Sequence, residues 1–133
     1  MVKSDRDHAI RLLEMASRDA VALDNMLDRK RFAEEVFGFH AQQAIEKALK
    51  AWIASLGREY PKTHDLSLLV NLIRRSGGDI DAFDGLEEFT VFAVQYRYEG
   101  YDEQDEPLDR SAAAVRIRAL LSHVRERIAG KTA

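Results

Sequence analysis

The sequence predicts an all-α protein, an up-and-down four-helix bundle with one additional short helix, formed by residues 1–133 as a single domain. Three observations lead to this fold class. The chain has 133 residues, the length of one domain. Apolar residues recur at spacings of three and four along most of it, which is the period of amphipathic helices. No stretch sustains the apolar–polar alternation that is typical of half-buried strands.

The first two predicted helices are long and are separated by the polar residues 28–30. The first follows Ser4, which with Asp7 resembles a capping box. Its apolar stripe is Ala9, Leu13, Ala16, Ala20, Leu23 and Leu27. The second is predicted over about residues 31–56 and ends at Gly57, a residue suited to a left-handed cap. One face of it is mostly small, which allows a neighbouring backbone to approach closely: Phe37, Ala41, Ala44, Ala48, Ala51 and Ser55.

Three further helices are predicted in the second half of the chain. Pro61 cannot continue the preceding helix, and Thr63 or Asp65 is suited to cap the next one. The stripe of that helix is Leu66, Leu69, Val70 and Ile73. After the turn at residues 76–79, a helical period follows in Phe83, Leu86, Phe89, Thr90, Ala93 and Arg97. An acidic loop leads to Pro107, which suits a first helical turn, and to the last stripe, Ala113, Ile117, Leu120, Leu121, Val124 and Ile128.

Composition excludes several classes of function. The chain has no cysteine, so it contains neither disulfides nor thiolate metal sites. It shows no signal peptide and no apolar run of membrane-spanning length, which predicts a cytoplasmic protein without a membrane segment. A net charge of −3 gives no overall attraction to DNA. Neither a phosphate-binding glycine loop nor a metal-ligand pair occurs, and no cofactor is expected.

A strip of polar residues on the second helix is the first candidate site. Gln43, Glu46, Lys47 and Lys50 are three and four residues apart and therefore share one face. Two interpretations are open. The strip is either a solvated helix surface, with Glu46 and Lys50 as an ordinary ion pair, or a binding surface whose lysines neutralise phosphate.

Two residues near helix ends are the other candidates. His64 stands between Thr63 and Asp65 at a predicted helix start, where backbone N–H groups favour an anion. It is either a capping and hydrogen-bonding residue or a functional one. Arg97, between two tyrosines at the end of an apolar helix, suits phosphate binding through its fork of donors, or neutralisation of the last helix carbonyls.

The order of these motifs resembles the HEPN domain family. The resemblance rests on residues 42–50 (QQAIEKALK), then residues 61–66 (PKTHDL), then Arg97-Tyr98, and spans about residues 5–128. It implies a helical bundle, usually a homodimer, often paired with a minimal nucleotidyltransferase in toxin–antitoxin systems. It also implies a nucleotide site, whose candidate residues here are Gln43, Lys47, His64 and Arg97.

Some members of this family are metal-independent RNases that carry an arginine, four to six residues, then a histidine. No histidine follows Arg97 at that spacing, so the chain resembles the non-nuclease branch. Three hypotheses stay open. The chain is a non-catalytic nucleotide- or partner-binding subunit, an RNase toxin with His64 as its acid–base residue, or a structural dimeric adaptor. The adaptor would use an apolar face formed by Phe89, Phe92 and Tyr96.

Overall fold

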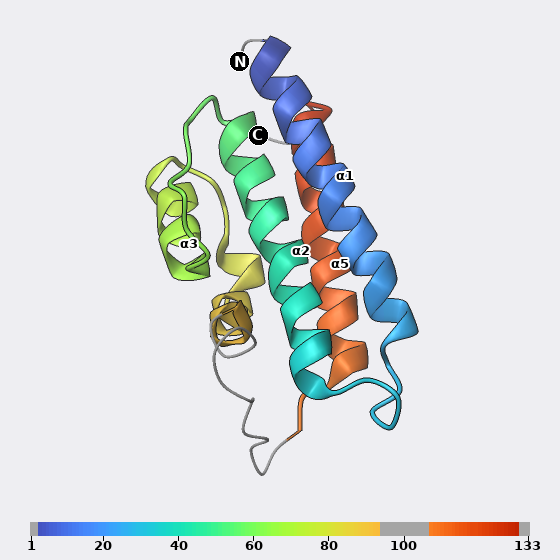
Figure 1. Cartoon of the computed structure of the whole chain (residues 1–133). Helices are drawn as coiled ribbons and strands as arrows, with labels where there is room; N and C mark the ends of the chain where they lie inside the picture. The colour runs from blue at the N-terminus through green and yellow to red at the C-terminus, as the bar shows by residue number, and fades with distance from the viewer. Residues whose placement is uncertain (1–2, 94–106, 131–133) are drawn as a thin grey trace.

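A computed structural model describes residues 3–93 and 107–130, and every regular element within these ranges is helical. Three long helices, α1 (Lys3–Asn25), α2 (Glu34–Ser55) and α5 (Arg110–Ile128), pack against one another. The shorter α3 (Leu66–Arg75) packs on α2, on the side away from α1 (Figure 1). The predicted all-α fold class is confirmed. No helix in the described ranges is both long enough and apolar enough to cross a bilayer.

Helix α2 lies at the centre because it packs against α1, α3 and α5 (Figure 1). Five of the six residues predicted to form the closely packed face are fully buried, namely Phe37, Ala41, Ala44, Ala48 and Ala51, and so is Trp52 beside them. The sixth, Ser55, is only partly buried because it is the last residue of α2. Helices α2 and α5 run in the same direction, and α1 runs opposite to both (Figure 1). The apolar stripes predicted for these helices meet in one core around α2. Leu27 is the exception: it lies beyond the end of α1 and is 40% exposed, so its place in the first stripe was wrong.

The helix predicted from residue 83 onward is broken. Two short 3-10 helices, η1 (Asp81–Phe83) and η2 (Leu86–Phe89), precede a helical stretch that reaches residue 93, where the description stops. Gly85 separates them with φ of 97°, a left-handed conformation that an α-helix cannot contain. The prediction of one continuous helix was wrong there, because the apolar period was followed across a glycine break.

Helix ends agree in part with the sequence signals. Gly57 has φ of 74° just after α2, and the Asp65 side chain accepts the Ser67 backbone N–H at 2.9 Å, so both predicted ends are confirmed. Two predicted starts were wrong. Helix α1 already includes Lys3, so Ser4 lies inside it. Helix α5 begins at Arg110, three residues after Pro107, because Asp109 caps it by accepting the Ala112 N–H at 3.0 Å.

Phe89 and Phe92 belong to the core of the monomer. They are 8% and 5% exposed, and their rings lie 5.7 Å apart. The Phe92 ring lies directly on α2, because a Cβ added to Gly38 would stand 2.1 Å from it. These two rings are therefore not an exposed adaptor face, and the third residue of that predicted face, Tyr96, lies outside the described residues.

Candidate functional site

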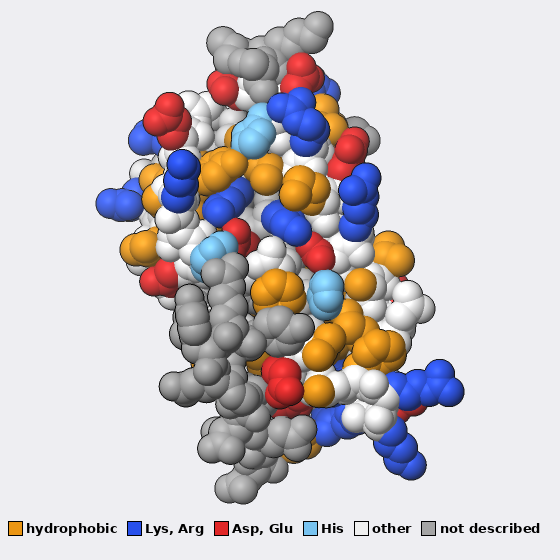
Figure 2. All heavy atoms as spheres, in the orientation of Figure 1, with side chains coloured by type: hydrophobic (Ala, Val, Ile, Leu, Met, Phe, Trp, Pro, Cys, Tyr) orange, Lys and Arg blue, Asp and Glu red, His pale blue; other side chains and the backbone are white. Residues whose placement is uncertain are grey.

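A network of polar side chains covers the side of α2 that lies between α1 and α3. We call it the α2 polar face; it consists of Asp19, His40, Gln42, Gln43, Glu46, Lys47, Lys50 and His64. Four of the α2 residues recur three or four positions apart, as the sequence predicted. Asp19 comes from α1, and His64 comes from the segment that joins α2 to α3. Figure 2 shows basic and histidine side chains gathered on this side of the molecule, with acidic ones among them.

The Glu46 carboxylate is the centre of the face. The residue is only 5% exposed. Its Oε1 accepts the Gln42 amide N–H at 2.9 Å and lies 2.8 Å from His64 Nδ1. Its Oε2 accepts Lys50 Nζ at 2.9 Å. Burial, the largest single effect, raises the pKa of Glu46, but the hydrogen bonds from Gln42, His64 and Lys50 together outweigh it and lower the pKa. The group is therefore a carboxylate at neutral pH.

Asp19 forms a second centre of the same kind. Its Oδ2 accepts Lys47 Nζ at 2.8 Å, and its Oδ1 lies 3.2 Å from His40 Nδ1. The Asp19 side chain is 14% exposed and that of Lys47 is 21% exposed. Each of the two mostly buried carboxylates thus holds one lysine and one histidine at the surface of α2.

Tyr60 extends the face toward the start of α1. Its hydroxyl lies 2.7 Å from His8 Nε2, and the two rings stack with centroids 5.8 Å apart. Lys50 Nζ lies 5.3 Å from the centre of the Tyr60 ring, within range of a cation–π contact. Burial and, to a lesser degree, the negative charge of Glu46 raise the pKa of Tyr60. The phenol therefore stays neutral beside the charged network.

Three of the four predicted site residues lie in this network. Gln43 donates to Gln42 Oε1 at 2.7 Å, Lys47 binds Asp19, and His64 binds Glu46. The fourth, Arg97, lies outside the described residues. The strip is not a solvated surface, because the Glu46 and Lys50 side chains are only 7% and 12% exposed.

His64 does not cap α3 with its side chain. Asp65 takes that role, and Thr63 Oγ1 accepts the Asp65 backbone N–H at 3.0 Å. The imidazole of His64 turns to Glu46 instead, and the backbone carbonyl of His64 accepts the Gln42 amide at 3.2 Å. Two hydrogen bonds to α2 therefore fix the segment that carries this histidine.

Sequence reasoning missed several members of the network, chiefly Asp19, His40 and Gln42. One signal was present for Asp19. It lies three residues after Ala16 and four before Leu23, and so on the buried stripe of α1, where an acid needs a partner. Gln42 gave a similar signal, because Ile45 and Leu49 follow it three and seven residues later on a buried side of α2, and it is fully buried.

The face has the chemistry of an anion-binding surface. Each lysine ammonium has three N–H donors and uses one on its carboxylate, so donors remain for a phosphate or carboxylate ligand. His64 is half exposed, with Nδ1 on Glu46 and Nε2 as its other ring nitrogen. Within residues 3–93 and 107–130, no group of three or more acidic and histidine side chains is arranged to hold a metal ion.

Comparison with known proteins gives one family. The model of the HEPN domain matches residues 9–127, which includes both carboxylate centres. No curated protein and no solved structure matches the chain. The match covers most of the 133 residues, so it concerns the whole bundle rather than a fragment of it.

Proposed function

We propose that this chain, which belongs to the HEPN domain family, is a non-catalytic subunit that binds a nucleotide on its α2 polar face. In this proposal it forms a homodimer and pairs with a minimal nucleotidyltransferase, as in a toxin–antitoxin system. The binding residues are Gln43, Lys47, His64 and Arg97. Lys47 and Arg97 contact phosphate, and Gln43 and His64 orient it.

The observation that carries the proposal is the pair of carboxylate centres. Glu46 and Asp19 hold Lys50 and Lys47, which are one turn apart on α2, together with His64 of the segment before α3 and His40 of α2. A lysine side chain normally loses rotamer freedom when it binds a ligand, and here the ion pair with a carboxylate has already reduced that freedom. A polyphosphate meets preoriented donors, so less of the binding free energy is spent on ordering them.

The charge balance limits the affinity of this face. Asp19 and Glu46 neutralise Lys47 and Lys50, so the four groups carry no net charge together. Arg97 is the residue that would add a full positive charge to the site. We therefore assign Arg97 the larger share of phosphate binding, Lys47 a smaller share, and His64 a positioning role.

Calorimetric titration of the chain with ATP and with GTP tests the nucleotide site. Lys47→Gln should weaken binding about tenfold, the equivalent of one charged hydrogen bond, and Arg97→Ala should abolish it. Lys30→Gln is the matched control, because Lys30 is exposed in the turn between α1 and α2. Undiminished binding by folded Arg97→Ala and Lys47→Gln would refute this site.

The partner is tested separately, by purifying the tagged chain from its native cells and identifying what accompanies it. A small nucleotidyltransferase in stoichiometric amount is expected. Purification of the chain alone, as a homodimer, would refute the pairing and leave the nucleotide measurement to stand by itself.

One observation favours a second function, metal-independent RNA cleavage. A carboxylate 2.8 Å from Nδ1 orients the His64 ring, and Nε2 is then the nitrogen available to accept or donate a proton. In this alternative Arg97 stabilises negative charge on the phosphate in the transition state. RNA should then be cleaved in the presence of EDTA, and His64→Ala should lose the activity while His123→Ala retains it. Equal cleavage by His64→Ala and the parent chain would exclude His64 as the acid–base residue.

A further inference from the structure

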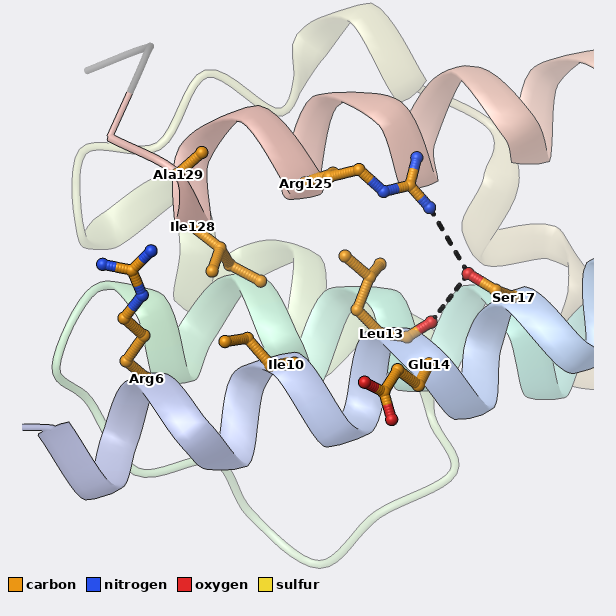
Figure 3. Close-up of a pocket in the computed structure, with 8 residues that line it drawn as sticks. All are labelled: Arg6, Ile10, Leu13, Glu14, Ser17, Arg125, Ile128 and Ala129. Atoms are coloured by element: carbon orange, nitrogen blue, oxygen red, sulfur yellow. Dashed lines mark hydrogen bonds between the residues drawn. The ribbon is translucent and has the colours of Figure 1, made fainter.

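A hollow of about 300 Å³ opens between α1 and α5, away from the α2 polar face. Figure 3 shows its lining, which includes Ile10, Leu13 and Ile128 between two arginines, Arg6 and Arg125. Ser17 and Asp19 are two residues apart on α1 and hence about 200° apart around the helix. The hollow, which Ser17 lines, and the carboxylate centre at Asp19 therefore occupy opposite faces of α1.

The floor of the hollow is aliphatic. Leu13 and Ile128 are each 7% exposed, and Ile10 is a partly buried side chain packed against the core. These side chains come from both helices and converge between the two ribbons (Figure 3). A floor of this kind has no donor or acceptor to offer, so it suits the apolar body of a ligand.

The rim of the hollow is basic. Neither Arg6 nor Arg125 forms an ion pair with any of the described residues. Arg125 Nη2 lies 3.5 Å from Ser17 Oγ, and that hydroxyl donates its own hydrogen to the Leu13 carbonyl at 2.9 Å. This long contact turns the guanidinium toward α1 and leaves most of its donors unused.

The charges of the lining favour an anion. Glu14 is the one acidic residue among the eight that line the hollow, against the two arginines. Its carboxylate makes no ion pair with a described residue, so it occupies no donor of either guanidinium, and two positive charges stand against one negative. The volume is at the lower end of the range for small-molecule sites.

We propose that this hollow binds a small amphipathic anion, an aliphatic or aromatic carboxylate whose body lies on Ile10, Leu13 and Ile128. The carboxylate accepts hydrogen bonds from Arg125, Arg6 or both, a geometry in which the guanidinium fork matches two carboxylate oxygens. This site is independent of the nucleotide site proposed above, because the two lie on opposite faces of α1.

The test is a titration of the whole chain with sodium octanoate, in which NMR monitors the methyl signals. Saturable shifts are expected for the methyl groups of Ile10, Leu13 and Ile128. Octan-1-ol, which has the same chain without the charge, should bind at least tenfold more weakly. Octanoate and octanol binding equally would show an apolar surface only and would overturn the proposal.

Variants locate the anion contact. Arg125→Gln and Arg6→Gln should each weaken octanoate binding, by about tenfold for the residue that holds the carboxylate. Arg11→Gln is the matched control, because Arg11 is an exposed residue of α1 outside the lining. Unchanged octanoate binding in the folded Arg6→Gln/Arg125→Gln double variant would overturn the proposal. In the NMR titration of the parent chain, shifts confined to other methyl groups would also overturn it, and so would shifts that do not saturate at millimolar octanoate.

Discussion

Replacing Glu46 by glutamine should lower the free energy of unfolding by about 3 kcal/mol, because it leaves a charged lysine without its partner inside the fold. The substitution keeps the shape of the side chain and one acceptor oxygen. It removes the negative charge that Lys50 Nζ contacts at 2.9 Å, and the Lys50 side chain is only 12% exposed. It also places an amide N–H group among donors from Gln42 and His64.

The magnitude follows from these contacts. Removing one partner of a buried ion pair costs about 3–5 kcal/mol. The Tyr60 ring, 5.3 Å from Lys50 Nζ, retains about 0.5–1 kcal/mol of stabilisation for the unpaired ammonium. About 3 kcal/mol then remains. For a chain of this length it corresponds to a fall of about 10 °C in the melting temperature.

Thermal and urea unfolding at neutral pH measure this loss. Glu126→Gln, an exposed glutamate of α5, is the matched control and should change stability by less than about 0.5 kcal/mol. A Glu46→Gln melting temperature equal to that of the control would refute the reasoning, because the carboxylate would then not hold Lys50 in the fold.

The effect should also depend on pH with a defined sign. The fold lowers the pKa of Glu46 below its ordinary value of 4.5. Its stabilising contribution is therefore complete above that value and is lost as the pH falls through the lower, folded-state pKa. The stability difference between parent and Glu46→Gln should be constant near neutrality and should shrink below pH 4.5. A difference that grows in acid would contradict this assignment.

Three other perturbations test the packing around the site. Gly38→Ala should lower the free energy of unfolding by about 1–3 kcal/mol, because the added Cβ would stand 2.1 Å from the Phe92 ring. This clash outweighs the higher helix propensity of alanine. In a urea titration, Gly38→Ala/Phe92→Leu should recover part of the lost stability. Burial and, to a lesser degree, the charge of Arg127 lower the pKa of His123, so the free energy of unfolding should fall as the pH drops below 6.5. In thermal melts from pH 7 to 5, His123→Phe should remove this pH dependence of the melting temperature. Asp65→Ala should cost about 1 kcal/mol in the same melts, because Asp65 caps α3.

The helices could be predicted because their signals are local. An apolar period of three and four located α1, α2, α3 and α5, and Gly57 and Asp65 marked two of their ends. The same period failed at residues 83–93, where Gly85 breaks the helix without disturbing the spacing of the apolar residues. Periodicity reports which side of a segment is apolar, and it is insensitive to one residue of left-handed backbone.

The polar face could be predicted only in outline. Spacing placed Gln43, Glu46 and Lys47 on one side of α2, and that grouping depends only on helix geometry. The pairing of Glu46 depends on where the segment carrying His64 comes to lie, and that of Lys47 on where the middle of α1 comes to lie; these are contacts across 18 and 28 residues of chain. Such contacts are set by the packing of whole helices, so the sequence left open whether the strip was solvated.

The charged and amide side chains of the α2 polar face raise the question of whether they serve stability or binding. Ion pairs buried in a protein can often be replaced by apolar residues of similar volume without loss of stability. Stability alone therefore does not require Glu46, Lys50 and fully buried Gln42 on this face of α2. A Glu46→Met/Lys50→Met variant separates the two explanations, since it removes both charges together. We expect its free energy of unfolding to lie within about 1 kcal/mol of the parent's and its ATP binding to be weaker, because Glu46 no longer orients His64. If the double variant instead loses as much stability as Glu46→Gln and binds ATP as tightly as the parent, the Glu46 centre serves the fold and has no part in nucleotide binding.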